Sequence, residues 1–124
     1  VIASHYVNAR YALEALLPDA SEAYLCDLPR PLKHHDTMAP YRNAERYLEQ
    51  VIAHAFNLKI EEMGGVRAID ERLLLTERRD LMPTGHWIID EAQCFEWHVV
   101  PWSAEVSEWS FLHRFKELTS CRTQ

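Results

Sequence analysis

Apolar residues recur at three- and four-residue steps along much of the chain, which is the spacing of an amphipathic α-helix. The clearest run predicts a helix over 41–56, with an inner face made of Tyr41, Ala44, Leu48, Val51, Ile52, Ala55 and Phe56. Pro40 suits the first turn of this helix, and Asn57 can end it. We expect its outer, solvent-exposed face to carry Arg42, Glu45, Arg46, Glu49 and Gln50.

The first part of the chain predicts a second helical region that a proline interrupts. Residues 3–17 have an apolar face made of Val7, Ala12, Leu13, Leu16 and Leu17. Pro18 would kink or break a continuous helix, but it can also open a new one, so we expect a short helix over 18–25. Two more prolines then predict an extended segment over 29–32.

Two further helices are predicted towards the C-terminus. Gly64 and Gly65 mark a turn. The helix expected after them, over 66–81, would turn these residues inward: Val66, Ile69, Leu73, Leu74 and Leu81. Ser103 is a sound N-cap for a last helix, for which the expected core residues are Val106, Trp109, Leu112, Phe115 and Leu118.

The stretch between these two helices is ambiguous. Residues typical of β-structure gather within 86–100, and they allow one small β-hairpin there. Every other element has helical spacing. The predicted fold class is therefore all-α, a helical bundle to which this hairpin would be the single β addition.

Composition narrows the class of protein. A chain of 124 residues, 48% of them apolar, favours one domain over 1–124 with a real core. The net charge of −6 argues against binding to a nucleic-acid polymer. No apolar run is long enough for a transmembrane helix, so no membrane association is expected. Three widely spaced cysteines favour a reduced, cytoplasmic protein: Cys26, Cys94 and Cys121.

The densest group of chemically capable side chains lies between Asp19 and Lys33. Asp19 and Glu22 are three residues apart and would share a helix face, where two carboxylates can hold a hard divalent cation. A stiff Pro-Arg-Pro segment follows Asp27 and could fix Arg30 and Lys33 beside a phosphate. The same spacing also suits helix-start acids and surface cations, so the residues alone leave both interpretations open.

The same string resembles the HD-domain phosphohydrolases, in particular the small bacterial and phage branch related to the 5'-deoxynucleotidases. The residues that carry the resemblance are, in order, Asp19, Ala20, Glu22, Ala23, Tyr24, Leu25, Asp27, Pro29, Arg30, Pro31, Leu32 and Lys33. Segments 41–58, 69–78, 101–103 and 111–115 resemble later parts of that branch. The resemblance therefore covers nearly the whole chain.

This resemblance implies an HD-domain-like helical bundle and a metal-dependent phosphohydrolase. Its substrate would be a nucleotide, either a deoxynucleoside monophosphate or triphosphate. Asp19 and Asp70 would bind a divalent metal ion (Mn, Co, Zn or Mg), and Glu22 would be the catalytic carboxylate that serves the attacking water. The substrate-binding residues that the resemblance implies are Asp27, Arg30 and Lys33.

Two positions depart from the family pattern. Pro18 stands where the family has His. The family spacing puts a further His before Val1, so we expect that an N-terminal segment is missing. The alternative hypothesis is a catalytically inactive HD-type domain that binds a nucleotide or a protein partner. A structural helical subunit is a third option, and a homo-oligomer stays open in each case.

Other candidate ligands have simpler structural interpretations. His34 and His35 fall in a loop, where solvent exposure is the plain expectation. Cys94 and His98 have a helical ligand spacing but supply only half of a zinc site. Large aromatic side chains usually fill space, so we expect the four tryptophans in the core: Trp87, Trp97, Trp102 and Trp109.

Overall fold

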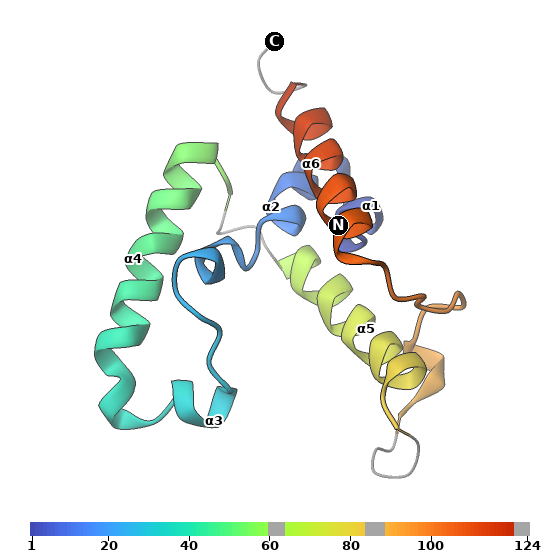
Figure 1. Ribbon diagram of the computed structural model, residues 1–124, viewed down its shortest axis with the longest axis horizontal. Coiled ribbons are helices and arrows are strands. Elements are labelled where there is room, and N and C mark those ends of the chain that lie inside the picture. The colour runs from blue at the N-terminus through green and yellow to red at the C-terminus, as the bar shows by residue number, and fades with distance from the viewer. Residues whose placement is uncertain (60–63, 84–88, 121–124) are drawn as a thin grey trace. The chain divides into compact units, whose positions relative to one another are not determined.

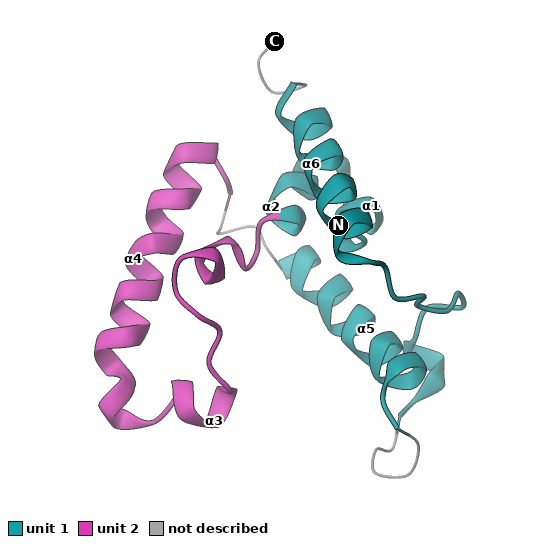
Figure 2. Ribbon diagram, viewed as in Figure 1, with its two compact units in different colours: residues 1–16, 61–124 teal, residues 17–60 magenta. Residues whose placement is uncertain are grey.

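The computed structural model describes residues 1–59, 64–83 and 89–120, and these are helical with connecting turns (Figure 1). The all-α prediction is confirmed for this part of the chain. The chain divides into two compact units, one of residues 1–16 and 61–124 and the other of residues 17–60 (Figure 2). The single domain expected over 1–124 stays a prediction. We call these unit 1 and unit 2 and describe each by itself.

Unit 1 is built from helices at both ends of the sequence. Its elements are α1 (Ala3–Tyr6), η1 (Ala9–Tyr11), α2 (Ala12–Leu16), α5 (Gly64–Leu81), η5 (Glu91–Gln93) and α6 (Ala104–Ser120). A small core joins the first turns of the chain to α5, and its members are Ala3, Ala15 and Val66 with Val7, Tyr11, Ile69 and Leu73 packed against them. The inward positions predicted for Val66, Ile69 and Leu73 are therefore confirmed.

The prediction of one helix over 3–17 is wrong, because the chain breaks after α1. Val7 is extended, with φ −89° and ψ 167°. The side chain of Asn8 then accepts a hydrogen bond from the backbone N–H of Arg10 at 3.1 Å, which caps η1. A short polar side chain that bonds to its own backbone offers the chain an alternative to a continuous helix.

Helix α5 begins earlier than the sequence predicts. Gly64 and Gly65, expected to form a turn, are its first two residues. Among the described residues, nothing lies within 4 Å of a Cβ placed on either glycine. Leu74 and Leu81, predicted to face inward, are both exposed instead.

Helix α6 has its cap where predicted but turns a different face to the protein. The Ser103 hydroxyl accepts from the backbone N–H of Val106 at 3.3 Å. Arg114 points inward, where its Nη2 donates to the Ser4 carbonyl at 2.9 Å. This contact sets the rotation of the helix, so Phe115 and Leu118 are half-buried, as expected. The prediction of core positions is wrong for three exposed residues: Val106, Trp109 and Leu112.

The hairpin expected near 86–100 is not found in the described part of that range. Residues 86–88 lie outside the described residues, and 89–100 contain η5 but no strand. Hydrogen bonds from side chains of α5 hold this segment, in place of a paired strand. Alternating β-type residues therefore reflect burial of one side of an irregular segment.

Unit 2 consists of η2 (Ala20–Ala23), α3 (Arg30–Lys33), η3 (Asp36–Met38) and α4 (Ala39–Phe56). The extent of the long helix is confirmed, with Pro40 in its first turn and Asn57 in the left-handed region at φ 50° and ψ 47°. Its predicted inner face is wrong at Val51 and Phe56, which are both exposed. The short helix expected over 18–25 is only the 3₁₀ turn η2. The extended segment expected over 29–32 is wrong, because Pro31 sits in the first turn of α3, where proline is tolerated.

Among the described residues, no helix is both long enough and apolar enough to cross a membrane.

Candidate functional site

The predicted site residues of unit 2 come from two short elements, η2 and α3, and from the connection between them. Asp19 precedes η2, and its carbonyl accepts from the backbone N–H of Glu22 at 2.9 Å, so the first turn holds the two residues together. Asp27 follows in the connection to α3, which carries Arg30 and Lys33. Glu22 and Lys33 are half-buried, whereas the other three are exposed.

Lys33 is held firmly against helix α4. Its Nζ donates to Oε1 of Glu45 at 2.6 Å, and the Glu45 residue is only 7% exposed. The hydrogen bond to Glu45 raises the pKa of Lys33 above its ordinary value, so the ammonium stays charged at neutral pH. Arg42 Nη1 fixes the backbone as well, by donating to the carbonyls of Lys33 and His35 at 2.8 Å each.

The outer face predicted for the long helix is therefore wrong at Arg42 and Glu45. Both residues have helical spacing that puts them on the polar side, and α3 then packs over that side. The contact joins Lys33 to a residue twelve positions later, and no local pattern signals such a pairing. Sequence reasoning consequently missed Glu45, a residue that determines where Lys33 lies.

Glu22 lies at the centre of a group of charges. Partial burial raises its pKa above the ordinary 4.5, and repulsion from Asp19 and from Asp27 raises it further, while Lys33 opposes the shift. Asp19, Asp27 and Lys33 thus each lie within electrostatic reach of Glu22. We call Asp19, Glu22, Asp27 and Lys33 the carboxylate cluster.

The remaining predicted ligand, Asp70, belongs to unit 1. It is exposed on α5, and its charge adds to burial in raising the pKa of Glu77. Its part in the site stays a prediction from the resemblance.

The donor chemistry of the carboxylate cluster suits a hard ion. Carboxylate oxygens are the ligands that Mg²⁺ and similar cations prefer, and such ions keep several waters. No three His, Cys, Asp or Glu side chains within the described ranges are grouped so that they could hold a metal ion. A metal in this cluster would therefore depend on few protein ligands.

The loop histidines have local structural roles. His35 caps η3, where its Nδ1 accepts from the backbone N–H of Thr37. His34 ends α3, and its backbone N–H donates to the Arg30 carbonyl at 3.1 Å. Both side chains are exposed, as expected.

Comparison with known proteins places the chain in a family. No family model matches it, and no solved structure matches it significantly. It is 32% identical over 126 aligned positions to the uncharacterized protein YfdR of Escherichia coli (strain K12), an alignment that covers 98% of this chain and 70% of that protein. The chain belongs to the YfdR family.

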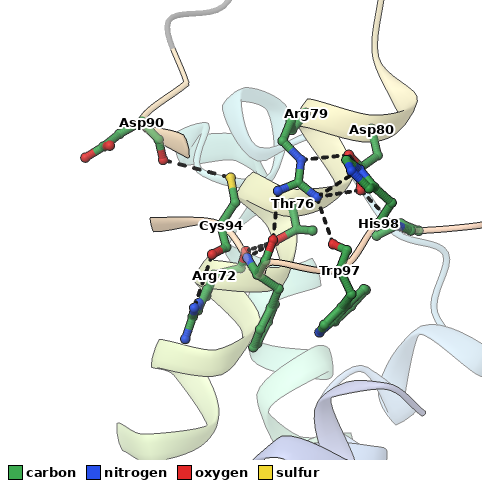
Figure 3. A network of polar contacts seen from close by, with 10 residues as sticks. Arg72, Thr76, Arg79, Asp80, Asp90, Cys94, Trp97 and His98 are labelled. Atoms are coloured by element: carbon green, nitrogen blue, oxygen red, sulfur yellow. Dashed lines mark hydrogen bonds and ion pairs between the residues drawn. The ribbon is translucent and has the colours of Figure 1, made fainter. Parts of the chain in front are cut away.

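This member of the YfdR family also has a polar network in unit 1 that the sequence did not predict (Figure 3). Arg79 donates two hydrogen bonds to Asp80, from Nε to Oδ1 at 2.7 Å and from Nη2 to Oδ2 at 3.0 Å. The Asp80 side chain is only 6% exposed and also accepts from the backbone N–H of Val99 at 2.6 Å. These bonds hold the pKa of Asp80 far below its ordinary value, with the Arg79 contact as the largest cause.

The same network joins α5 to the 94–99 segment. Arg79 donates to the carbonyls of Phe95 and Trp97 at 2.7 and 2.8 Å. His98 Nδ1 lies 2.9 Å from Oδ1 of Asp80, which forms a histidine–carboxylate pair. The Cys94 thiol instead contacts the Asp90 carbonyl. This member of the YfdR family therefore has the carboxylate cluster in unit 2 and a histidine paired with a carboxylate in unit 1.

Proposed function

We propose that this protein is a metal-dependent phosphohydrolase that acts on a nucleotide, a deoxynucleoside mono- or triphosphate. The observation that carries the proposal is the raised pKa of Glu22 beside Asp19 and Asp27, with Lys33 fixed close by on Glu45. Residues that resemble the HD-domain pattern in the sequence thus share one charged environment in unit 2. The HD-domain form of the helical bundle is part of the same proposal.

Glu22 is suited to act as the general base. A general base works best when its pKa approaches the working pH, and both burial and neighbouring carboxylates shift Glu22 in that direction. In the proposed reaction Glu22 accepts a proton from water, the water oxygen bonds to phosphorus as the P–O ester bond breaks, and the leaving ester oxygen takes up a proton from Glu22 or from solvent. The neighbouring carboxylates would serve the metal ion, and Lys33 would serve the phosphate.

Lys33 is suited to the phosphate. Its charge is retained because Glu45 raises its pKa, and its position is restricted by the hydrogen bonds that it and its carbonyl make. An ammonium group held in place loses less freedom when an anion binds. Arg30, one turn earlier on the same short helix, would meet the substrate from the exposed side.

The divalent metal would be held by Asp19 and, from the resemblance, by Asp70. When bound, such an ion lowers the pKa of water and offsets the negative charge of the phosphate. The carboxylate donors favour Mg²⁺ or Mn²⁺ over softer ions.

Phosphate release is the direct test. The full chain is incubated with nucleoside and deoxynucleoside mono- and triphosphates, with Mg²⁺, Mn²⁺, Co²⁺ or Zn²⁺ added and with EDTA as a control. We expect metal-dependent release from at least one deoxynucleotide. Release that EDTA leaves unchanged would contradict the metal-dependent mechanism.

Glu22→Gln is the decisive variant. It keeps the shape of the side chain and removes the base, so we expect kcat to fall by about 100-fold or more, with the circular-dichroism spectrum unchanged. Glu49→Gln is the matched control, because Glu49 lies in the same unit, has a raised pKa and is given no role. Equal turnover in Glu22→Gln and the wild type would remove Glu22 from the mechanism.

One observation favours the second candidate function, an inactive HD-type domain that binds a nucleotide or a protein partner. Helix α2 ends at Leu16, two residues before Pro18, and Asp19 lies outside the helical region at φ −108° and ψ 24°. The turn that would aim a metal ligand is therefore irregular. This candidate predicts a folded protein with no phosphate release under any metal.

Pro18→His separates the two candidates further. It restores the side chain that the resemblance expects, so we predict at least about tenfold tighter Mn²⁺ binding by calorimetry. Pro18→Ala is the control, since it removes the proline without adding a ligand. Equal affinities in the two variants would show that the family's metal arrangement does not extend to this chain.

A further inference from the structure

Unit 1 contains a cavity that the proposed function does not use. Its volume is about 410 Å³, within the range of small-molecule sites. Helix α1 lines it with His5 and Tyr6, and Ile2 lies just before them. The other wall is the 97–102 segment, which contributes Trp97, His98 and Trp102 together with two valines.

Aromatic rings give this cavity flat walls. Tyr6 and Trp97 stack with their centroids 5.7 Å apart and their planes at 28°. Behind them Phe95 lies 5.0 Å from Trp97 and 4.8 Å from Tyr6, and the Arg72 guanidinium covers the Phe95 ring at 4.3 Å. Rings held in this way lose little freedom when another planar ring stacks on them.

His98 presents a defined nitrogen at the edge of the cavity. The Nδ1 of His98 lies 2.9 Å from Oδ1 of Asp80, a carboxylate that accepts, and 3.3 Å from Nη2 of Arg79. The network around Asp80 fixes the ring (Figure 3). The other nitrogen, Nε2, is left to meet a ligand, and the side chain is 76% exposed.

The Trp97 indole supplies a second polar group. Its Nε1 is buried and has no hydrogen-bond partner among the described residues. A buried donor without a partner costs about 1–3 kcal/mol, and a ligand acceptor that reached Nε1 after a small shift of the ring would remove that cost. The described lining contains no Asp, Glu, Lys or Arg, so it is not built for a highly charged ligand.

From this geometry we infer that the cavity of unit 1 binds an uncharged, planar heteroaromatic molecule that both donates and accepts hydrogen bonds. The ring would stack against Tyr6, Trp97 and Trp102. His98 Nε2 would accept from a ligand N–H, and the Trp97 N–H would gain an acceptor. The inference is independent of phosphate hydrolysis in unit 2.

Indole N–H signals in a ¹⁵N-resolved NMR spectrum of the full chain test the inference at the proposed atom. The probes are adenosine, cytidine and nicotinamide, which carry no phosphate, and EDTA is present so that a metal site plays no part. Cyclohexanecarboxamide is the matched control, because it has the amide of nicotinamide without an aromatic ring. The Trp97 signal is assigned by its loss in Trp97→Phe.

We expect at least one heteroaromatic probe to move the Trp97 signal saturably, with a Kd in the range of about 1 mM or tighter, and cyclohexanecarboxamide to leave it in place. No movement with any of the three probes at about 10 mM would overturn the inference. Equal affinity for the saturated control would also overturn it, since a generic apolar pocket would then suffice.

Variants locate the binding. Trp97→Phe keeps a ring and removes the N–H, and we expect it to weaken probe binding by about tenfold. Val100→Lys places a charge on a lining residue that is 72% exposed, so folding is spared and binding should fall similarly. Trp109→Phe is the control outside the cavity and should bind as the wild type does. Unchanged binding in both cavity variants would place the ligand elsewhere and overturn the inference.

Discussion

Thr76 shows at the residue scale how one hydroxyl can connect two segments. It is fully buried on α5, its Oγ1 donates to the Arg72 carbonyl at 2.8 Å, and it accepts from the backbone N–H of Phe95 at 3.0 Å. The second bond satisfies a backbone donor in a segment that has no strand partner. Thr76 therefore stabilises the 94–99 segment, and with it the wall of the cavity.

Thr76→Val tests this role with an isosteric change. The buried Phe95 N–H loses its acceptor, so we expect the free energy of unfolding to fall by about 2 kcal/mol. Thr76→Ser keeps the hydroxyl and loses one methyl, so we expect the free energy of unfolding to fall by about 1 kcal/mol. Urea denaturation measures both. A valine variant at least as stable as the serine variant would show that the hydroxyl is not what matters.

At the scale of elements, signals within or beside a segment predicted the features that depend on neighbouring residues alone. Helix α4 was predictable because its apolar spacing, Pro40 and Asn57 all lie within the helix or beside it. The break at Val7 was missed, since Asn8 caps through its side chain in a sequence whose apolar spacing continues. Residue pairs distant in the chain, such as Lys33 with Glu45, could not be predicted, because their meeting depends on how α3 packs.

The candidate site also contains some residues that local signals could predict and others that depend on contacts distant in the chain. The string that contains Asp19, Glu22 and Asp27 could be singled out from its residue types and its resemblance, and these side chains do share one environment. The contact with Glu45 that holds Lys33 could not be predicted, because Glu45 has the spacing of an exposed helix residue. The Asp80–His98 pair was equally hidden, since eighteen positions separate its members.

Asn57 gives a prediction at the element scale. It ends α4 in the left-handed region at φ 50°, where a Cβ is unfavourable and Asn is one of the few residues tolerated. We expect Asn57→Ala to lower the free energy of unfolding by about 1 kcal/mol and Asn57→Gly to leave it nearly unchanged. Denaturant unfolding monitored by circular dichroism makes the comparison.

The same substitution elsewhere in α4 serves as the control. Asn43 is exposed within the helix, so Asn43→Ala should raise stability by about 0.5 kcal/mol through helix propensity. Opposite signs at positions 43 and 57 would confirm that backbone conformation, and not the loss of an amide, decides the effect. Equal destabilisation at both positions would contradict it.

For the whole molecule, the response to acid depends on where carboxylates lie more than on the net charge of −6. In unit 1 the folded protein holds Asp80 in its ionised form, with the pKa lowered from 3.8. In unit 2 it disfavours the ionised form of Glu22, with the pKa raised from 4.5. The Asp80 charge therefore stabilises the fold, and the Glu22 charge opposes it.

Two variants should consequently move stability in opposite directions at neutral pH. Asp80→Asn should lower Tm, because Arg79 and the Val99 N–H lose an ionised acceptor. Glu22→Gln should raise Tm, because the cost of burying the charge and the repulsion from Asp19 and Asp27 both disappear. Asp90→Asn, an exposed position where Asn can keep the cap of η5, should have little effect.

The pH dependence of these differences identifies their cause. The loss in Asp80→Asn should be constant at neutral pH and shrink as pH falls below the unfolded value of 3.8, because the unfolded chain then binds a proton at Asp80 that the folded protein does not yet bind. The gain in Glu22→Gln should shrink as pH falls through the raised folded pKa and vanish below the unfolded value of 4.5, because Glu22 is then protonated in both states. Thermal melts of the three variants from neutral pH into acid measure both. Differences independent of pH would mean that packing, not ionisation, is responsible.

If Glu22→Gln is more stable and also inactive, the protein retains at Glu22 a charge that folding alone disfavours, as expected for a base kept for chemistry.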